Sequence, residues 1–193
     1  MAVATRPHAR ALATTARIPG VAPGSGGLLT RLVYRIARRG YGRVPMPLQV
    51  TARSPWVFRG YVAYEYGLDH ARSLDRGLVE LVGTRVAQLA DCPFCVDIGS
   101  ALARRAHVPQ AKLDALGSEP DGVYTPLESL ALEYASAMTA TPQAVSDELV
   151  ARLRSALSDE QVVELTAVIA FENYRARFNA AMGIGAEGYD FRR

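Results

Sequence analysis

The stretch ADCPFCVDIGSALARRAH, from Ala90 to His107, holds both cysteines of the 193-residue chain. Cys92 and Cys95 are separated by Pro93 and Phe94. Because proline favours the first position of a helix, a helix is predicted to begin at Pro93, with Cys92 as its N-cap and Cys95 in its first turn. The positive end of the helix dipole stabilises a thiolate at either position. By this argument alone, Cys92 is slightly favoured as the attacking thiolate, because it is nearer the helix end.

A Cys-x-x-Cys pair has three usual interpretations. It can supply half of a zinc site, but no second pair of this kind is present and the three histidines are scattered (His8, His70 and His107). It can be two buried apolar side chains, although this spacing is unlikely to arise by chance. It can be a thiol–disulfide redox centre, which the local chemistry favours. We therefore expect no metal and no cofactor, with a zinc site shared between subunits as a remote alternative.

Hydrophobic periodicity predicts helices along most of the chain, and no segment shows sustained strand alternation. The motif follows a long helical pattern, whereas the thioredoxin motif follows a strand, so a thioredoxin fold does not fit. Two capping-box patterns mark helix starts, at Thr125–Glu128 and Ser158–Gln161, and Gly183 marks a helix end. The prediction is an all-α fold of seven to eight helices, with the motif at the N-terminus of a core helix. The expected helices cover about 28–39, 54–69, 73–90, 92–105, 109–116, 125–138, 146–156 and 158–182.

Charge divides the chain into a basic arm and an acidic body. Ten arginines precede the first acidic residue, Glu65, which leaves twelve basic and nineteen acidic residues for the rest. A basic arm can contact nucleic acid or an anionic membrane. No basic motif interleaved with aromatic residues is present, so we expect no nucleic-acid partner. The plainer expectation is that the arm folds onto its own acidic body or onto a neighbouring subunit.

Three segments are expected along the chain. Residues 1–27, with several prolines and a Gly-Ser-Gly-Gly run, are expected to form a flexible leader. Residues 28–44 are expected to form a basic amphipathic helix and a loop; the helix is more simply docked by its apolar side than laid on a membrane. Residues 45–193 are expected to form the helical domain. No stretch has the apolar length of a membrane span or the form of a secretory signal, so the protein is expected to be cytoplasmic.

A redox thiol needs a group that accepts its proton, and Glu80 is the candidate. It lies twelve residues before Cys92 on the preceding helix, and a tight turn between the two helices would bring it back beside the thiols. Its neighbours Leu78, Val79, Leu81 and Val82 are apolar, so burial is expected to raise the pKa of the carboxyl toward neutrality. The alternative is a solvated surface glutamate.

These residues resemble the carboxymuconolactone decarboxylase/AhpD-like superfamily, whose AhpD branch is alkylhydroperoxidase-like. The resemblance covers about residues 45–185. It is carried by Glu80–Leu89, by the cysteine motif Cys92–Asp97, by Thr125–Thr139, and by Gln161–Thr166 and Asn173–Asn179 of the closing helix. It implies an all-α fold assembled as trimers or hexamers. It also implies that Cys95 attacks the oxygen of an organic hydroperoxide, that Cys92 resolves the product as a disulfide, that Glu80 relays protons, and that a lipoyl- or thioredoxin-type dithiol restores the thiols.

One position departs from the family pattern C-x-x-C-x-x-x-H, because Gly99 stands where the histidine is expected. Asp97 falls on another side of the helix from Cys95, and His107 lies about three turns beyond Cys95. His70 could come from a neighbouring helix. Tyr174 and Arg177 either line the site or serve as a packed aromatic ring and a surface ion pair.

Three functions remain open from the sequence. The first is a cysteine-based peroxidase or thiol oxidoreductase that uses the Cys92/Cys95 pair. The second is a cofactor-free decarboxylase-like enzyme acting on a small organic acid, a chemistry that needs no cysteine pair. The third is a non-enzymatic, oligomeric redox sensor that has lost peroxidase activity with the missing histidine.

Overall fold

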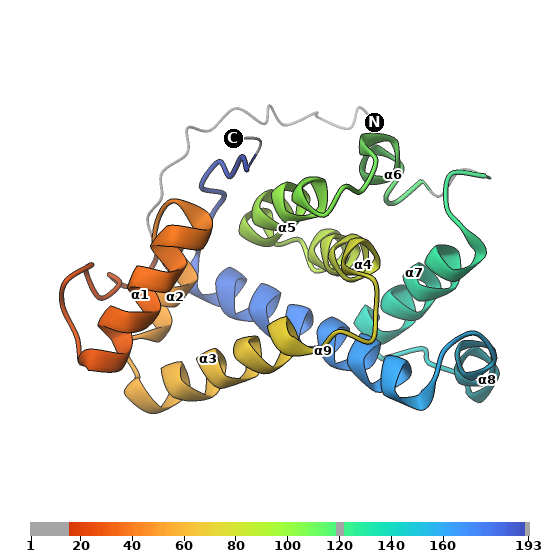
Figure 1. The fold of residues 1–193 in the computed structure, drawn as a ribbon, viewed down its shortest axis with the longest axis horizontal. Helices are drawn as coiled ribbons and strands as arrows, with labels where there is room; N and C mark the ends of the chain where they lie inside the picture. Colours follow the sequence, from red (N-terminus) through yellow and green to blue (C-terminus); the bar gives the residue numbers. More distant parts are fainter. Residues whose placement is uncertain (1–15, 119–121, 192–193) are drawn as a thin grey trace, which may run out of the picture.

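The computed structural model describes residues 16–118 and 122–191, which form nine helices and no strand (Figure 1). The all-α prediction is confirmed, and the helix beyond the expected seven to eight is α2. In chain order the helices are α1 (Leu28–Tyr41), α2 (Met46–Thr51), α3 (Pro55–His70), α4 (Arg76–Leu89), α5 (Pro93–Arg105), α6 (Gln110–Asp114), α7 (Pro126–Thr139), α8 (Asp147–Ala156) and α9 (Asp159–Met182).

The turn between α4 and α5 reverses the chain within three residues. Asp91 adopts a positive φ of 48°, a conformation that aspartate tolerates better than most residues. Its N–H donates to Gln88 O at 3.1 Å, while the N–H of Cys92 donates to Ala87 O at 3.0 Å. This pair of bonds is a Schellman closure of α4. Because the turn is so short, α4 and α5 lie side by side (Figure 1).

The longest helix, α9, organises the rest of the molecule. It contacts α3, α4, α5, α7 and α8. Its predicted capping box is confirmed: Ser158 Oγ accepts from the N–H of Gln161, and the Gln161 side chain accepts from the N–H of Ser158. It ends at Gly183, whose φ of 67° gives the expected left-handed cap. One helix therefore touches both the main core and the cysteine motif.

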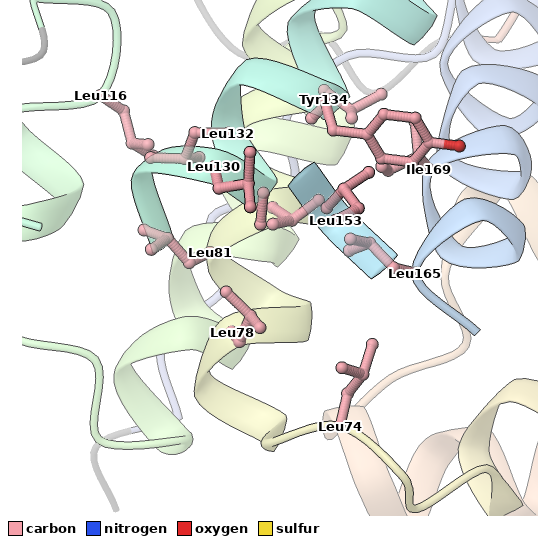
Figure 2. Close-up of a cluster of buried hydrophobic side chains, with 14 of the residues drawn as sticks. Leu74, Leu78, Leu81, Leu116, Leu130, Leu132, Tyr134, Leu153, Leu165 and Ile169 are labelled. Atoms are coloured by element: carbon pink, nitrogen blue, oxygen red, sulfur yellow. The ribbon is translucent and has the colours of Figure 1, made fainter. Parts of the chain in front are cut away.

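The main core lies between α4, α7, α8 and α9. Leu81, Leu153, Leu165 and Ile169 are each 0% exposed. Figure 2 shows these side chains meeting those of α7, including Leu132 and Tyr134. A second cluster surrounds Cys92 and Cys95 and includes Phe94, Ala176 and Tyr189. The cysteines therefore pack as core residues as well as forming the Cys-x-x-Cys motif.

Several predicted boundaries are wrong by a few residues. No helix was expected between residues 39 and 54, but α1 continues through Tyr41 and α2 begins at Met46. Proline at the second position of α2 is compatible with a helix start, which that expectation overlooked. The start expected near Ser73 lies at Arg76, because Asp75 is the N-cap and accepts from the N–H of Leu78.

The docking of α1 also differs from expectation. The helix packs through Tyr34 and Ala37, which are 4% and 6% exposed. Most of the apolar side that was expected to dock, formed by Leu28, Leu29, Leu32, Val33 and Ile36, stays open. Leu28, Leu32 and Ile36 are 86%, 51% and 59% exposed, and Val33 is partly buried. Tyr34 decides this orientation, because its ring packs edge-on against Phe58 and its hydroxyl donates to Val21 O. In the described part of the chain, no helix has the length and apolar character needed to cross a membrane.

The segment before α1 contacts the body. The N–H of Arg17 donates to Met182 O at 2.7 Å, and the N–H of Val21 donates to Gln49 O at 2.9 Å. For residues 1–15, the expectation of a flexible leader lies outside the described residues.

Truncation of a core leucine in α9 tests the packing. Leu165→Ala should lower the free energy of unfolding by about 2–5 kcal/mol, because a fully buried leucine leaves a cavity that its neighbours fill only in part. The measurement is urea unfolding followed by circular dichroism. Val163→Ala, on the same helix at 68% exposure, should change stability by less than about 0.5 kcal/mol. Equal losses in the two variants would contradict this view of the core.

Candidate active site

The cysteine motif has the predicted local structure. Cys92 is the N-cap of α5, with φ −106° and ψ 95°, and Pro93 is the first helical residue. The Cys92 sulfur accepts from the N–H of Cys95 at 3.2 Å, as a capping side chain does. The two residues form a disulfide with a Cα–Cα separation of 5.3 Å, within the usual range. They are 1% and 4% exposed, so the motif is an enclosed dithiol–disulfide centre.

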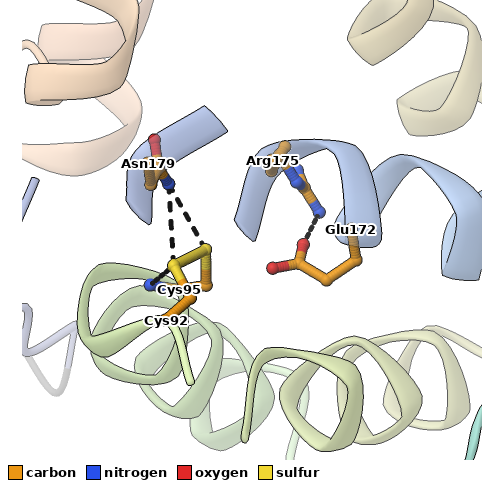
Figure 3. The surroundings of a disulfide bond; sticks show 5 residues. All are labelled: Cys92, Cys95, Glu172, Arg175 and Asn179. Carbon is orange, nitrogen blue, oxygen red and sulfur yellow. Dashed lines mark hydrogen bonds and ion pairs between the residues drawn. A yellow bond between two sulfur atoms is a disulfide. The ribbon is translucent and has the colours of Figure 1, made fainter. Parts of the chain in front are cut away.

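The side chain of Asn179, in α9, points its nitrogen toward the sulfur atoms of Cys92 and Cys95 (Figure 3). Its Nδ2 lies 3.3 Å from Cys95 Sγ and 3.8 Å from Cys92 Sγ, with the amide as donor. The residue is 2% exposed. Its Oδ1 is buried and has no hydrogen-bond partner among the described residues. Sequence reasoning did not assign Asn179 a role, because 84 residues separate it from Cys95 and no local pattern links them.

A cavity of 310 Å³ opens beside the disulfide. Its lining residues come mainly from α1, α2, α3, α4, α5 and α9. Cys95 is among the lining residues, and Cys92 is not. Val33, Ile36 and Val62 contribute an apolar wall. A small organic molecule in this cavity therefore meets Cys95 first, and the volume suits such a ligand.

Glu80 lines the same cavity, so the turn between α4 and α5 brings it to the same space as Cys95. It is 9% exposed, which contradicts the alternative of a solvated surface glutamate. Arg76, one turn earlier, pairs with it at 2.6 Å. Burial raises the pKa of Glu80 above its ordinary value, and the nearby Arg76 and Arg175 offset only part of that rise. The carboxyl is therefore poised to exchange protons closer to neutrality.

Arg175 is the centre of a second set of ion pairs in the cavity wall. It pairs with Glu172, one turn before it, and with Glu65 of α3 at 2.9 Å. The hydroxyl of Tyr61 donates to the same Glu65 carboxylate at 2.8 Å. Burial raises the pKa of Glu172 above its ordinary value, against the opposing effect of Arg175. Figure 3 shows Glu172 and Arg175 on the same helix as Asn179, close to the disulfide.

Gly99 also lines the cavity, one helical turn beyond Cys95. A Cβ built there would lie 3.1 Å from Thr84 Oγ1, tighter than ordinary contact. The Thr84 hydroxyl itself donates to Glu80 O at 2.8 Å. Gly99, which stands where the family has a histidine, thus lies where α4 and α5 approach each other closely. Thr84 occupies the space beside Gly99.

The other residues considered from the sequence lie elsewhere. His70 is exposed and stacks on Tyr66, and His107 lies past the end of α5 with a φ of 64°. Tyr174 packs in an aromatic row with Phe171, and Arg177 donates to Asn173. Neither Tyr174 nor Arg177 is among the residues that line the cavity. His8 lies outside the described residues.

Asp97 has a structural contact of its own. Its carboxylate accepts from the backbone N–H groups of Glu187, Gly188 and Tyr189, at 2.7–3.1 Å. The ring of Tyr189 then packs edge-on against Phe94 at 5.9 Å. Asp97 thus ties the segment after α9 over the cysteine cluster, and it is not among the residues that line the cavity.

Comparison with known proteins identifies the family. The model of the carboxymuconolactone decarboxylase family matches residues 55–137, which include Glu80 and both cysteines. The uncharacterised protein YnjA of Escherichia coli K12 is 39% identical over 163 residues, covering 83% of this chain and 90% of YnjA. The chain belongs to the carboxymuconolactone decarboxylase/AhpD-like superfamily. YdfG of Bacillus subtilis 168, also uncharacterised, is 34% identical over 113 residues, covering 58% of this chain and 77% of YdfG.

Several solved structures share the fold. An AhpD-core, peroxidase-related protein from Ralstonia eutropha JMP134 matches with a TM-score of 0.80 at 20% identity, covering 89% of this chain and 92% of that one. The debrominase Bmp8 matches with a TM-score of 0.75 at 24% identity, covering 83% and 87%. A variant of Bmp8 in complex with 2,3,4-tribromopyrrole matches with a TM-score of 0.79 at 22% identity, covering 88% and 90%.

The raised pKa of Glu80 predicts that the stability of Glu80→Gln, measured relative to wild type, increases as pH rises. The folded protein holds this proton more tightly than the unfolded chain, so wild-type stability falls as pH rises from the ordinary value of 4.5 through the raised folded pKa. Glutamine does not titrate. The free energy of unfolding of the variant, relative to wild type, should therefore increase from about pH 4 to about pH 7, as measured by urea unfolding.

Glu133→Gln is the matched control, because Glu133 is a half-exposed carboxylate outside the cavity, paired with Arg152. A relative stability of Glu80→Gln that stays constant or falls across this range would contradict the buried, proton-binding state of Glu80.

Proposed function

We propose that the protein is a thiol oxidoreductase of the AhpD-like type, which reduces an organic hydroperoxide through the Cys92/Cys95 pair. One observation carries this proposal: a disulfide at a helix N-terminus has one of its sulfur-bearing residues, Cys95, on a small cavity that also holds the buried carboxyl of Glu80. That arrangement supplies a nucleophile, a resolving thiol and a proton carrier together.

In the first step, Cys95 gives its proton to Glu80 and attacks as a thiolate. Its sulfur bonds to the terminal oxygen of the hydroperoxide while the O–O bond breaks, which leaves a sulfenic acid on Cys95 and an alkoxide. The alkoxide takes the proton from Glu80 and leaves as an alcohol. The raised pKa of Glu80 suits it to both transfers.

In the second step, the sulfur of Cys92 attacks the Cys95 sulfenic acid. The S–S bond forms, the S–O bond breaks, and hydroxide leaves with the Cys92 proton as water. A dithiol reductant then attacks the disulfide and is itself oxidised. Since Cys95 lines the cavity and Cys92 does not, we expect the reductant to attack Cys95 and release Cys92. A slender lipoyl-type dithiol fits this route better than a folded thioredoxin-type protein.

The same dithiol can deliver two electrons to another acceptor. The shared fold of the debrominase Bmp8 makes a brominated pyrrole the second candidate substrate. In that reaction a C–H bond replaces the C–Br bond: one thiol proton goes to the carbon, the other leaves with bromide, and the two sulfurs form the disulfide. The decarboxylase-like alternative uses no disulfide, so the Cys92–Cys95 bond weighs against it. The redox-sensor alternative differs from the proposal only in lacking turnover.

Peroxide-driven thiol loss tests this proposal. Reduced protein is mixed with cumene hydroperoxide, and free thiols are counted over time. We expect two thiols to be lost per chain, at least about tenfold faster than from free cysteine at the same pH, because the helix N-terminus and the cavity favour the thiolate. Cys95→Ser should abolish the fast loss, and Cys92→Ser should leave one fast thiol that stops at the sulfenic acid.

The controls distinguish the alternatives. Tribromopyrrole replaces the hydroperoxide in a parallel reaction, with bromide release as the readout. Fast loss that persists in Cys95→Ser would assign attack to Cys92. Loss no faster than from free cysteine with either compound would overturn the proposed function and favour the sensor or decarboxylase alternatives.

The exposed apolar side of α1 supports a homo-oligomer, which remains part of the proposal. Leu28, Leu32 and Ile36 lie on a helix that also carries four arginines without an ion pair among the described residues (Arg31, Arg35, Arg38 and Arg39). We expect light scattering to give a mass that is a multiple of 20.8 kDa. Leu32→Glu should reduce that mass. Arg152→Glu should not, because Arg152 lies in α8, which is at the other end of the molecule from α1 (Figure 1). A monomeric wild type would contradict this expectation.

A further inference from the structure

We infer that Tyr41 is a further catalytic residue, whose hydroxyl donates a hydrogen bond to the alkoxide oxygen released when Cys95 attacks the hydroperoxide. The inference rests on the proposed function and goes beyond it, because it assigns a donor to the leaving oxygen. Its basis is a phenol in the wall of the cavity that holds Cys95 and Glu80. In the part of the chain that the structure describes, the hydroxyl of this phenol has no hydrogen-bond partner.

Aromatic contacts hold the ring of Tyr41, which is the last residue of α1. The ring meets that of Tyr189 edge-on, with 6.5 Å between the centroids, and that of Phe191 at 6.1 Å. The residue is partly buried and packs against the cluster that contains both cysteines. The ring therefore has a fixed place in the cavity wall, and a phenylalanine at this position would keep its contacts while lacking the hydroxyl.

Charged groups of the same cavity act on the hydroxyl of Tyr41. Burial raises the pKa of Tyr41 to about 12, the charges on Glu65, Asp69 and Glu80 add to the rise, and Arg175 opposes it. All four charged residues line the cavity. Because Coulombic effects weaken with distance, the phenol oxygen lies on the side of these groups. With this pKa the hydroxyl keeps its proton at neutral pH, so it is available there as a donor.

Other donors in the cavity wall are already engaged. The hydroxyl of Tyr61 donates to the carboxylate of Glu65, and the hydroxyl of Thr84 donates to Glu80 O. The amide of Asn179 donates to the two sulfurs. None of these groups is free to donate to a ligand without giving up a contact within the protein.

The remaining polar side chains that could donate from the wall are paired or exposed. Arg76 and Arg175 each lie between two carboxylates. Tyr66 and Arg72 also line the cavity, but Tyr66 is 65% exposed and Arg72 is exposed as well, so water solvates both. Among the described residues that line the cavity, Tyr41 is therefore the partly buried side chain with an unused donor.

The hydrogen bond acts while the O–O bond breaks. The Cys95 thiolate bonds to the terminal oxygen of the hydroperoxide, which keeps its hydrogen, and the electron pair of the O–O bond passes to the oxygen attached to carbon. Negative charge develops on that oxygen, and a donor already in place stabilises such charge. Glu80 gives this oxygen its proton, as before. Tyr41 donates a hydrogen bond to the same oxygen and itself gains and loses no proton.

Two oxidants with different leaving groups test the inference in the full chain carrying Cys92→Ser, which leaves Cys95 as the sole thiol and keeps an N-cap side chain. Cumene hydroperoxide and peracetic acid both convert the thiolate to the same sulfenic acid, but the first releases an alkoxide and the second releases acetate. Acetate is a much weaker base, so its release gains less from a hydrogen bond. Tyr41→Phe should therefore lower the ratio of the cumene hydroperoxide rate to the peracetic acid rate by about tenfold, the effect expected for one lost hydrogen bond.

Tyr34→Phe is the matched control, because it removes the same atom from the same helix. The hydroxyl of Tyr34 donates to Val21 O, and Tyr34 is not among the residues that line the cavity. This variant should leave the ratio unchanged even where it lowers stability. Circular dichroism checks that each variant is folded, and Tyr41→Leu replaces Tyr41→Phe if the latter is not. A general disturbance of the site would slow both oxidants and leave the ratio as it was.

Each outcome has one meaning. A ratio that falls when Tyr41 is replaced, and not in Tyr34→Phe, supports the inference. A parent that reacts with cumene hydroperoxide faster than free cysteine does, and keeps its ratio when Tyr41 is replaced, overturns the inference and leaves the proposed function standing. A ratio that falls equally in both variants has the same meaning. A parent that reacts with cumene hydroperoxide no faster than free cysteine overturns both.

Discussion

The turn from Leu89 to Pro93 is the constraint on which the site depends. Cys92 closes α4 through its N–H bond to Ala87 O, and it caps α5 by accepting the N–H of Cys95. The same residue thus ends one helix, begins the next and carries one sulfur of the disulfide. A longer turn would let α4 and α5 diverge, and Glu80 would then no longer share a cavity with Cys95.

Charge within the cavity complements this geometry. Arg76 lies between Asp69 and Glu80, and Arg175 lies between Glu65 and Glu172, so carboxylates outnumber guanidinium groups. Burial raises the pKa of Asp69, Glu80 and Glu172 for the same reason. A thiolate added to this excess of negative charge favours protonation of a nearby carboxyl. In the proposed mechanism, this excess of negative charge would couple ionisation of Cys95 to protonation of Glu80.

Local signals in the sequence predicted much of the fold. Proline and cap residues gave the starts of α5, α7 and α9 correctly, because capping is decided within four residues. The helix α2 was missed, since its six residues show too little periodicity to stand out from a loop. The orientation of α1 was also wrong. Tyr34 docks by packing on Phe58 and bonding to Val21, partners that no pattern within α1 reveals.

The sequence by itself determined the all-α class, the cysteine pair at a helix N-terminus, and the return of Glu80 to the neighbourhood of that pair, because these depend on short-range spacing and one tight turn. Only the tertiary structure decided that Cys95 and not Cys92 lines the cavity, that Thr84 fills the space beside Gly99, and that Asn179 reaches the sulfurs. These features depend on how α9 packs across α4 and α5. That packing follows from burial of the whole core, so no single stretch of sequence contains it.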